Sequence, residues 1–85
     1  MKKFKLFSTE IQNLSILERL PHKDDRGLFE RLYCFSELEE LNCGTIRQIN
    51  RSQTIGTGTV RGLHFQVSPN YENKIVACTK GKICD

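Results

Sequence analysis

His64 is the residue of this sequence best suited to move a proton. An imidazole has an unperturbed pKa of about 6.5, near working pH, and a well-placed general base accelerates a reaction by about 10²–10⁴-fold. If residues 59–66 form a strand, alternation places His64 on one face with Gly62 and Gln66, and Arg61 on the other. The small neighbour leaves room for a ring, as the floor of a binding pocket would.

The pattern alone is equally consistent with His64 as a structural or surface histidine. The second histidine, His22, lies in a polar stretch, where a solvated side chain is the simplest interpretation. Lys74 follows a polar loop and begins the next predicted strand. An ammonium group can stabilise an anionic oxygen in a transition state, although a solvated lysine at the start of a strand is an ordinary alternative.

The segments that must position these residues are predicted to be short strands. Residues 4–7 and 14–20 alternate loosely between apolar and polar side chains, as half-buried strands do. Residues 22–27 are polar and end in glycine, which predicts a loop leading into a strand at residues 28–33. Further strands are predicted at residues 45–52, 59–66, 74–79 and 82–84, with a hairpin turn at residues 80–81.

One short helix is predicted from Ser36 to Leu41. Ser36 is a plausible N-cap, acidic residues follow it, and leucines lie three apart, while Asn42 and Gly44 supply stop signals. Short strands with glycine turns indicate an all-β fold, an antiparallel sandwich or barrel. We expect residues 1–85 to form a single partial domain, because the chain stops inside its last predicted strand.

Composition argues against several classes of protein. The 85 residues carry 13 Lys and Arg against 10 Asp and Glu, a net charge of +3, without the basic stripe of a nucleic-acid binder. No stretch approaches the roughly 18 apolar residues that span a bilayer. The four cysteines lack the spacing of a zinc or redox site. We therefore expect free thiols, a cytoplasmic location, and neither a nucleic-acid nor a membrane partner.

Three motifs in order give the sequence a resemblance to a known family. They are Asp-Arg-Gly-Leu-Phe-Glu at residues 25–30, Gln-Ile-Asn-Arg-Ser at 48–52, and Val-Arg-Gly-Leu-His-Phe-Gln at 60–66, followed by Lys-Ile-Val at 74–76. The set resembles the N-terminal part of dTDP-4-dehydrorhamnose 3,5-epimerases, which are dimeric, cupin-type jelly rolls. The resemblance covers roughly residues 14–85 and implies an incomplete antiparallel jelly roll.

The resemblance also implies an activity: epimerisation of a dTDP-4-keto-6-deoxyhexose, in a pathway of the dTDP-rhamnose type. It makes His64 the general base and Lys74 the cation that holds the enolate oxygen. The family's proton-donating tyrosine and the aspartate partner of its histidine would lie beyond Asp85. We therefore expect the 85-residue chain to be inactive by itself.

The substrate-binding residues come from the same resemblance. It implies that Arg26, Arg61, Gln48 and Asn50 bind the sugar and diphosphate, since guanidinium groups can bind phosphate oxygens in pairs. Alternating amides such as Gln48 and Asn50 are otherwise the solvent face of a strand.

The resemblance implies that one segment of the chain contacts a neighbouring subunit. The resemblance implies that Phe29 and Glu30 cross to the second subunit of a homodimer and help to bind the nucleotide, with the phenyl ring stacked on the base. Without it, Phe29 is most simply a core residue.

Two further expectations concern ligands and the rival function. Cupins often bind a metal through a His-x-His pair, but the corresponding residues here are His64, Phe65 and Gln66, so neither a metal nor a cofactor is expected. A close variant would act on another nucleotide sugar or at one carbon only. The alternative from another class is a non-catalytic remnant that binds a nucleotide sugar or dimerises.

Overall fold

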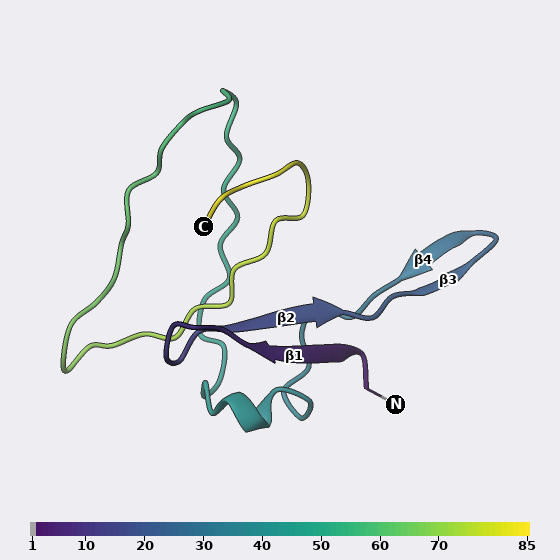
Figure 1. Ribbon diagram of the computed structural model, residues 1–85, viewed down its shortest axis with the longest axis horizontal. Helices are drawn as coiled ribbons and strands as arrows, with labels where there is room; N and C mark the ends of the chain where they lie inside the picture. The colour runs from purple at the N-terminus through teal and green to yellow at the C-terminus, as the bar shows by residue number, and fades with distance from the viewer. Residues whose placement is uncertain (1) are drawn as a thin grey trace. The chain divides into compact units, whose positions relative to one another are not determined.

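The structure is a computed structural model that describes residues 2–85. Contacts within the chain divide it into two units, Met1–Arg47 and Gln48–Asp85. The first unit holds four strands and one short helix, in the order β1, β2, β3, β4 and η1 (Figure 1). All strand pairs are antiparallel, so the prediction of a strand-rich, antiparallel fold with very little helix is confirmed for this unit.

The strands β1 (Phe4–Ser8) and β2 (Ser15–Arg19) form one two-stranded sheet. Phe4 pairs with Arg19 and Ser8 with Ser15, so the register follows the alternation of both segments. The connecting turn is closed by Thr9, whose hydroxyl donates to the carbonyl of Leu14 at 2.8 Å. Both strands lie where the sequence predicted them, because the pairing is local and needs no distant partner.

The strands β3 (His22–Asp24) and β4 (Gly27–Phe29) form a second hairpin. The prediction that residues 22–27 are a loop is therefore wrong for its first three residues. Asp24 explains the difference, because its carboxylate accepts hydrogen bonds from the backbone and side chain of Arg26 and closes a tight turn. Gly27 follows at a φ of 135°, a conformation that glycine adopts without strain. The predicted strand at 28–33 ends early, at Phe29.

The helix predicted at Ser36–Leu41 is reduced to the 3-10 helix η1, Glu39–Leu41. No side chain caps its N-terminus, which falls at Leu38. The hydroxyl of Ser36 instead lies 3.3 Å from the sulfur of Cys34, so it does not cap a longer helix. Asn42, in the left-handed conformation at a φ of 52°, ends the helix as predicted.

The buried core of the first unit is small. Phe4 of β1 is 7% exposed and Leu38 is 5% exposed. Glu37 accepts a hydrogen bond from the backbone N–H of Lys3 and another from the guanidinium of Arg31 at 2.7 Å. These two contacts, in that order of importance, lower the pKa of the Glu37 carboxyl.

Residues after Phe29 form no strand in the part of the chain that the structure describes. The strands predicted at 45–52, 59–66, 74–79 and 82–84 are therefore wrong for this structure, and Figure 1 draws them as coil. A strand exists only when its backbone pairs with a neighbour. The apolar side chains of these segments also lie open, with Leu63 93% and Phe65 78% exposed. The bend at residues 80–81 is present, but no hairpin forms around it.

Phe4→Ala should strongly destabilise the sheet formed by β1 and β2. Truncating a buried phenylalanine costs about 3–5 kcal/mol, which is comparable to the whole stability of a small unit. Phe7→Ala is the matched control in the same strand, since Phe7 is 42% exposed. Amide hydrogen exchange of β1 and β2 should accelerate far more in the first variant. Equal acceleration in both would contradict the placement of Phe4 in the core.

Candidate functional site

The structure brings the side chain of Lys74, predicted to stabilise a negative charge, into contact with the main chain of His64, the residue predicted to act as the base. The ammonium nitrogen of Lys74 donates a hydrogen bond to the backbone carbonyl of His64 at 2.6 Å. The same nitrogen lies 3.2 Å from a carboxylate oxygen of Glu72. Between His64 and Lys74 the chain turns back on itself, and the N–H of Asn70 donates to the carbonyl of Val67 at 2.8 Å.

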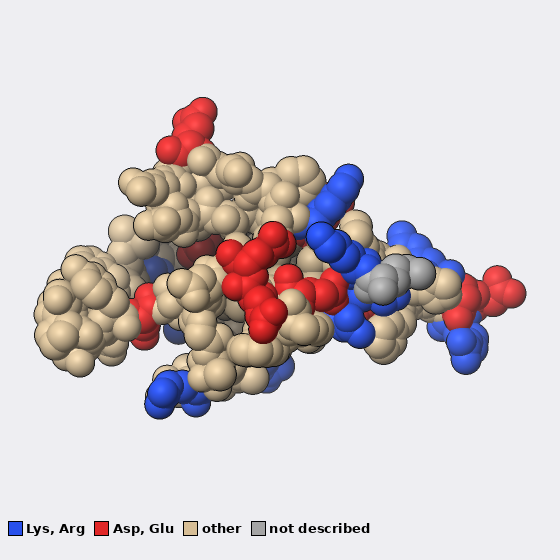
Figure 2. Space-filling model, turned by 90° about the horizontal axis from the view of Figure 1, so that it is seen from below, with Lys and Arg blue, Asp and Glu red and all other residues tan. Residues whose placement is uncertain are grey.

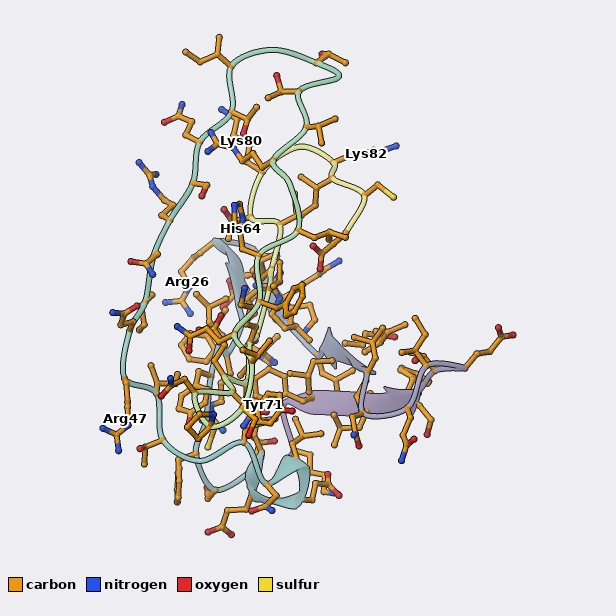
Figure 3. The ribbon with its side chains drawn as sticks, turned by 90° about the vertical axis from the view of Figure 1, so that its left-hand side faces the viewer. Arg26, Arg47, His64, Tyr71, Lys80 and Lys82 are labelled. Carbon is orange, nitrogen blue, oxygen red and sulfur yellow. The ribbon has the colours of Figure 1, made fainter. Side chains whose placement is uncertain are left out.

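His64 lies outside any strand, contrary to the sequence prediction. The common face that alternation gave it with Gly62 and Gln66 therefore does not follow from the structure. The residue is exposed, so its imidazole is open to solvent and to a ligand. Figure 3 draws Tyr71 well away from His64, so the phenol of Tyr71 is not placed as a proton donor opposite this imidazole.

Arg61 is held by its own loop. Its Nε atom donates to the hydroxyl of Thr54 at 2.9 Å, and a terminal nitrogen donates to the carbonyl of Gln53 at 3.0 Å. A guanidinium group has five N–H donors, so others stay available for phosphate oxygens. Gln48 and Asn50 are both exposed and lie outside any strand, which removes the argument that alternation puts them on one face.

The remaining predicted binding residues lie on or next to the β3–β4 hairpin. Arg26 is at its turn, where one terminal nitrogen contacts Asp24 at 2.7 Å while the side chain is 91% exposed. That contact, followed by the backbone N–H of Arg26, lowers the pKa of the Asp24 carboxyl. Phe29, at the end of β4, is 63% exposed and so is no core residue in this structure. Glu30 faces Arg19 at 3.5 Å.

Two partners of the predicted residues were missed by the sequence analysis. Glu72 faces Lys74, and Asp24 binds Arg26. Each acid precedes its basic partner by two residues, and both pairs lie at loops or turns. That spacing in a loop or turn is the signal that could have found them. For Asp24, the short acidic side chain of a turn folds back onto the following residues.

Charge on the hairpin side of the first unit is mixed. Figure 2 shows acidic and basic side chains interspersed on the right of the view, the side on which β3 and β4 lie in Figure 1. The basic side chains form no continuous stripe on that face. Among residues 2–85, no helix is long and apolar enough to cross a membrane, and no group of three or more His, Cys, Asp or Glu could hold a metal ion.

None of the four cysteines forms a disulfide bond among residues 2–85. Cys34 differs from the others in its surroundings. The hydroxyl of Ser36, first, and the backbone N–H of Glu37, second, lower the pKa of its thiol. The guanidinium of Arg31 adds a smaller electrostatic contribution in the same direction.

The chain belongs to the dTDP-4-dehydrorhamnose 3,5-epimerase family, whose model matches residues 8–85. The resemblance noted in the sequence is thereby confirmed for almost the whole chain.

Curated relatives carry the same name. A dTDP-4-dehydrorhamnose 3,5-epimerase of Sinorhizobium fredii is 50% identical over 80 residues, which cover 92% of this chain and 40% of the relative. Those of Escherichia coli and Salmonella typhimurium are each 35% identical, over 91% and 94% of this chain and 42% and 44% of their own lengths. The chain thus spans less than half the length of the curated relatives that it matches. No solved structure matches it.

Proposed function

We propose that this chain is the N-terminal portion of an enzyme that epimerises the carbons beside the ketone of a dTDP-4-keto-6-deoxyhexose. Membership of the family supports the reaction. The hydrogen bond from Lys74 to the carbonyl of His64, 2.6 Å long, is the structural observation that carries the assignment. It holds the ammonium against the main chain of His64, so the two residues that enolisation would use lie together in one segment.

In the proposed mechanism, His64 removes the proton from the carbon next to the ketone. The electrons move to the ketone oxygen, and the ammonium of Lys74 stabilises the resulting enolate. An acid on the opposite face of the ring then returns a proton, which inverts the carbon. That acid, and the aspartate partner of His64, would come from the part of the relatives' length that this chain does not span.

In the proposed site, the residues that bind the substrate differ from those that carry out the reaction. Arg26 and Arg61 bind the diphosphate through guanidinium donors, which suit phosphate geometry. Gln48 and Asn50 bind the sugar, while Phe29 stacks on the base and Glu30 supports it. The exposure of Arg26 and Phe29 supports a role in binding, because both side chains are open for contact.

The proposed complete protein is a cytoplasmic homodimer with a cupin-type jelly roll, of which this chain is one partial domain. In that complete protein, the segments after residue 48 pair as strands with the rest of the barrel and bury their apolar side chains. Their exposure here supports the proposal, because isolated strands bury too little apolar surface to be stable. Four cysteines that form no disulfide bond among residues 2–85 suit a reducing compartment.

The test is deuterium incorporation by the complete protein. With a dTDP-4-keto-6-deoxyhexose in D₂O, NMR should show deuterium entering the carbons beside the ketone, whereas the 85-residue chain alone should exchange none. Calorimetry with dTDP measures binding separately. Binding without exchange in the complete protein would favour a non-catalytic nucleotide-sugar binder and would refute the enzyme.

A further inference from the structure

We propose that Glu72 is a positioning residue for Lys74, holding its ammonium group beside His64 so that one N–H remains directed at the enolate oxygen. The inference rests on the proposed function and adds a residue that the motifs of the sequence did not single out. Its basis is the pair of contacts at Lys74 Nζ: 2.6 Å to the carbonyl of His64 and 3.2 Å to the Glu72 carboxylate.

Counting donors shows why two contacts matter. An ammonium group carries three N–H donors and accepts none. The carbonyl of His64 and the carboxylate of Glu72 engage two of them, which leaves one for a substrate oxygen. A lysine side chain loses rotamer entropy when it is fixed. A Lys74 already held by two partners loses less of it when substrate binds.

The loop makes this arrangement local. Lys74 follows His64 at the tenth position along the chain, and the hydrogen bond between them closes that stretch. Glu72 lies two residues before Lys74, inside the same closed stretch. The carboxylate therefore needs no distant element to place it beside Lys74.

Charge and orientation act in opposite directions at this site. A carboxylate beside the ammonium weakens its attraction for an enolate, whereas holding the ammonium in place strengthens it. The two side chains are 47% and 40% exposed, so solvent screens the pair. An exposed pair of this kind is worth at most about 1 kcal/mol. Screening weakens the unfavourable charge effect, so we expect orientation to dominate. The limit of about 1 kcal/mol corresponds to an effect of about fivefold on the rate.

In the complete protein, Glu72→Ala should lower the rate of deuterium exchange about fivefold with KM nearly unchanged, because the enolate forms only in the transition state. Glu72→Gln should keep most of the rate, since its amide oxygen can still accept from Lys74. In a Lys74→Ala background, Glu72→Ala should have no further effect, because the residue acts through Lys74. Glu10→Ala, at an exposed position of the first unit, is the matched control.

A readout that does not depend on turnover separates this inference from the proposed function. NMR of the ¹⁵N-labelled lysine ammonium groups should show faster solvent exchange at Lys74 in Glu72→Ala than in the parent. If the parent catalyses no exchange at carbon but this protection depends on Glu72, the enzyme proposal fails and the positioning role stands. Parental ammonium protection in Glu72→Ala, or a Glu72→Gln protein as slow as Glu72→Ala, would overturn it.

Discussion

His64→Ala in the complete protein should abolish deuterium exchange beside the ketone while leaving dTDP binding almost unchanged. The imidazole supplies the base, and removing a general base costs about 10²–10⁴-fold in rate. The affinity comes from other side chains, chiefly the guanidinium groups of Arg26 and Arg61. Deuterium wash-in followed by NMR measures the first effect, and calorimetric titration with dTDP measures the second.

His22→Ala is the matched control, because it removes the other imidazole of the chain. His22 is exposed in β3, where it pairs with Phe29. This variant should exchange deuterium at the parental rate. If His64→Ala kept the parental rate instead, the assignment of the base would be wrong, and the site would no longer be a candidate for enolisation.

Lys74→Ala should also slow exchange strongly, by roughly 10²-fold or more, because the enolate loses its nearest positive charge. The size of the effect follows from the removal of an oxyanion-hole donor, which costs about 3 kcal/mol. The loss should be in kcat more than in KM, since the charge develops only as the proton leaves. Single-turnover exchange in D₂O separates the chemical step from product release.

Lys82→Ala is the control for a change of net charge. Lys82 lies in the same unit and is exposed, and Figure 3 shows it away from His64. The variant removes one positive charge without touching the hydrogen bond to His64. Equal slowing in Lys74→Ala and Lys82→Ala would mean that long-range charge, rather than the contact at His64, controls the reaction.

The family and the first two strands were both predicted from the sequence. The motifs around Arg26, Gln48 and His64 pointed to the family, whose model then matched residues 8–85. The strands β1 and β2 were predicted from the alternation of their two segments, and the structure adds that a short turn pairs them antiparallel. Local pairing of this kind is encoded almost entirely by neighbouring residues.

Side-chain partners were harder to predict. Ser36 has the chemistry of an N-cap, but its hydroxyl lies beside Cys34, and only the 3-10 helix Glu39–Leu41 forms. Likewise, Asp24 turned part of a predicted loop into the strand β3 by binding Arg26. In each case two local hydrogen-bonding arrangements compete, and their difference of a few kcal/mol or less depends on geometry that composition does not report.

The sequence by itself determined the family, the positions of the strands β1 and β2, and the identity of the candidate side chains. Only the tertiary structure decided which alternating segments become strands and which acidic side chains contact Lys74 and Arg26. Alternation describes a segment's own two faces, whereas a strand also needs hydrogen bonds to a second backbone. Residues 59–66 alternate without such a partner and remain coil, with Leu63 open to solvent. The meeting of Lys74 with His64 and Glu72 depends in the same way on how the intervening chain folds back.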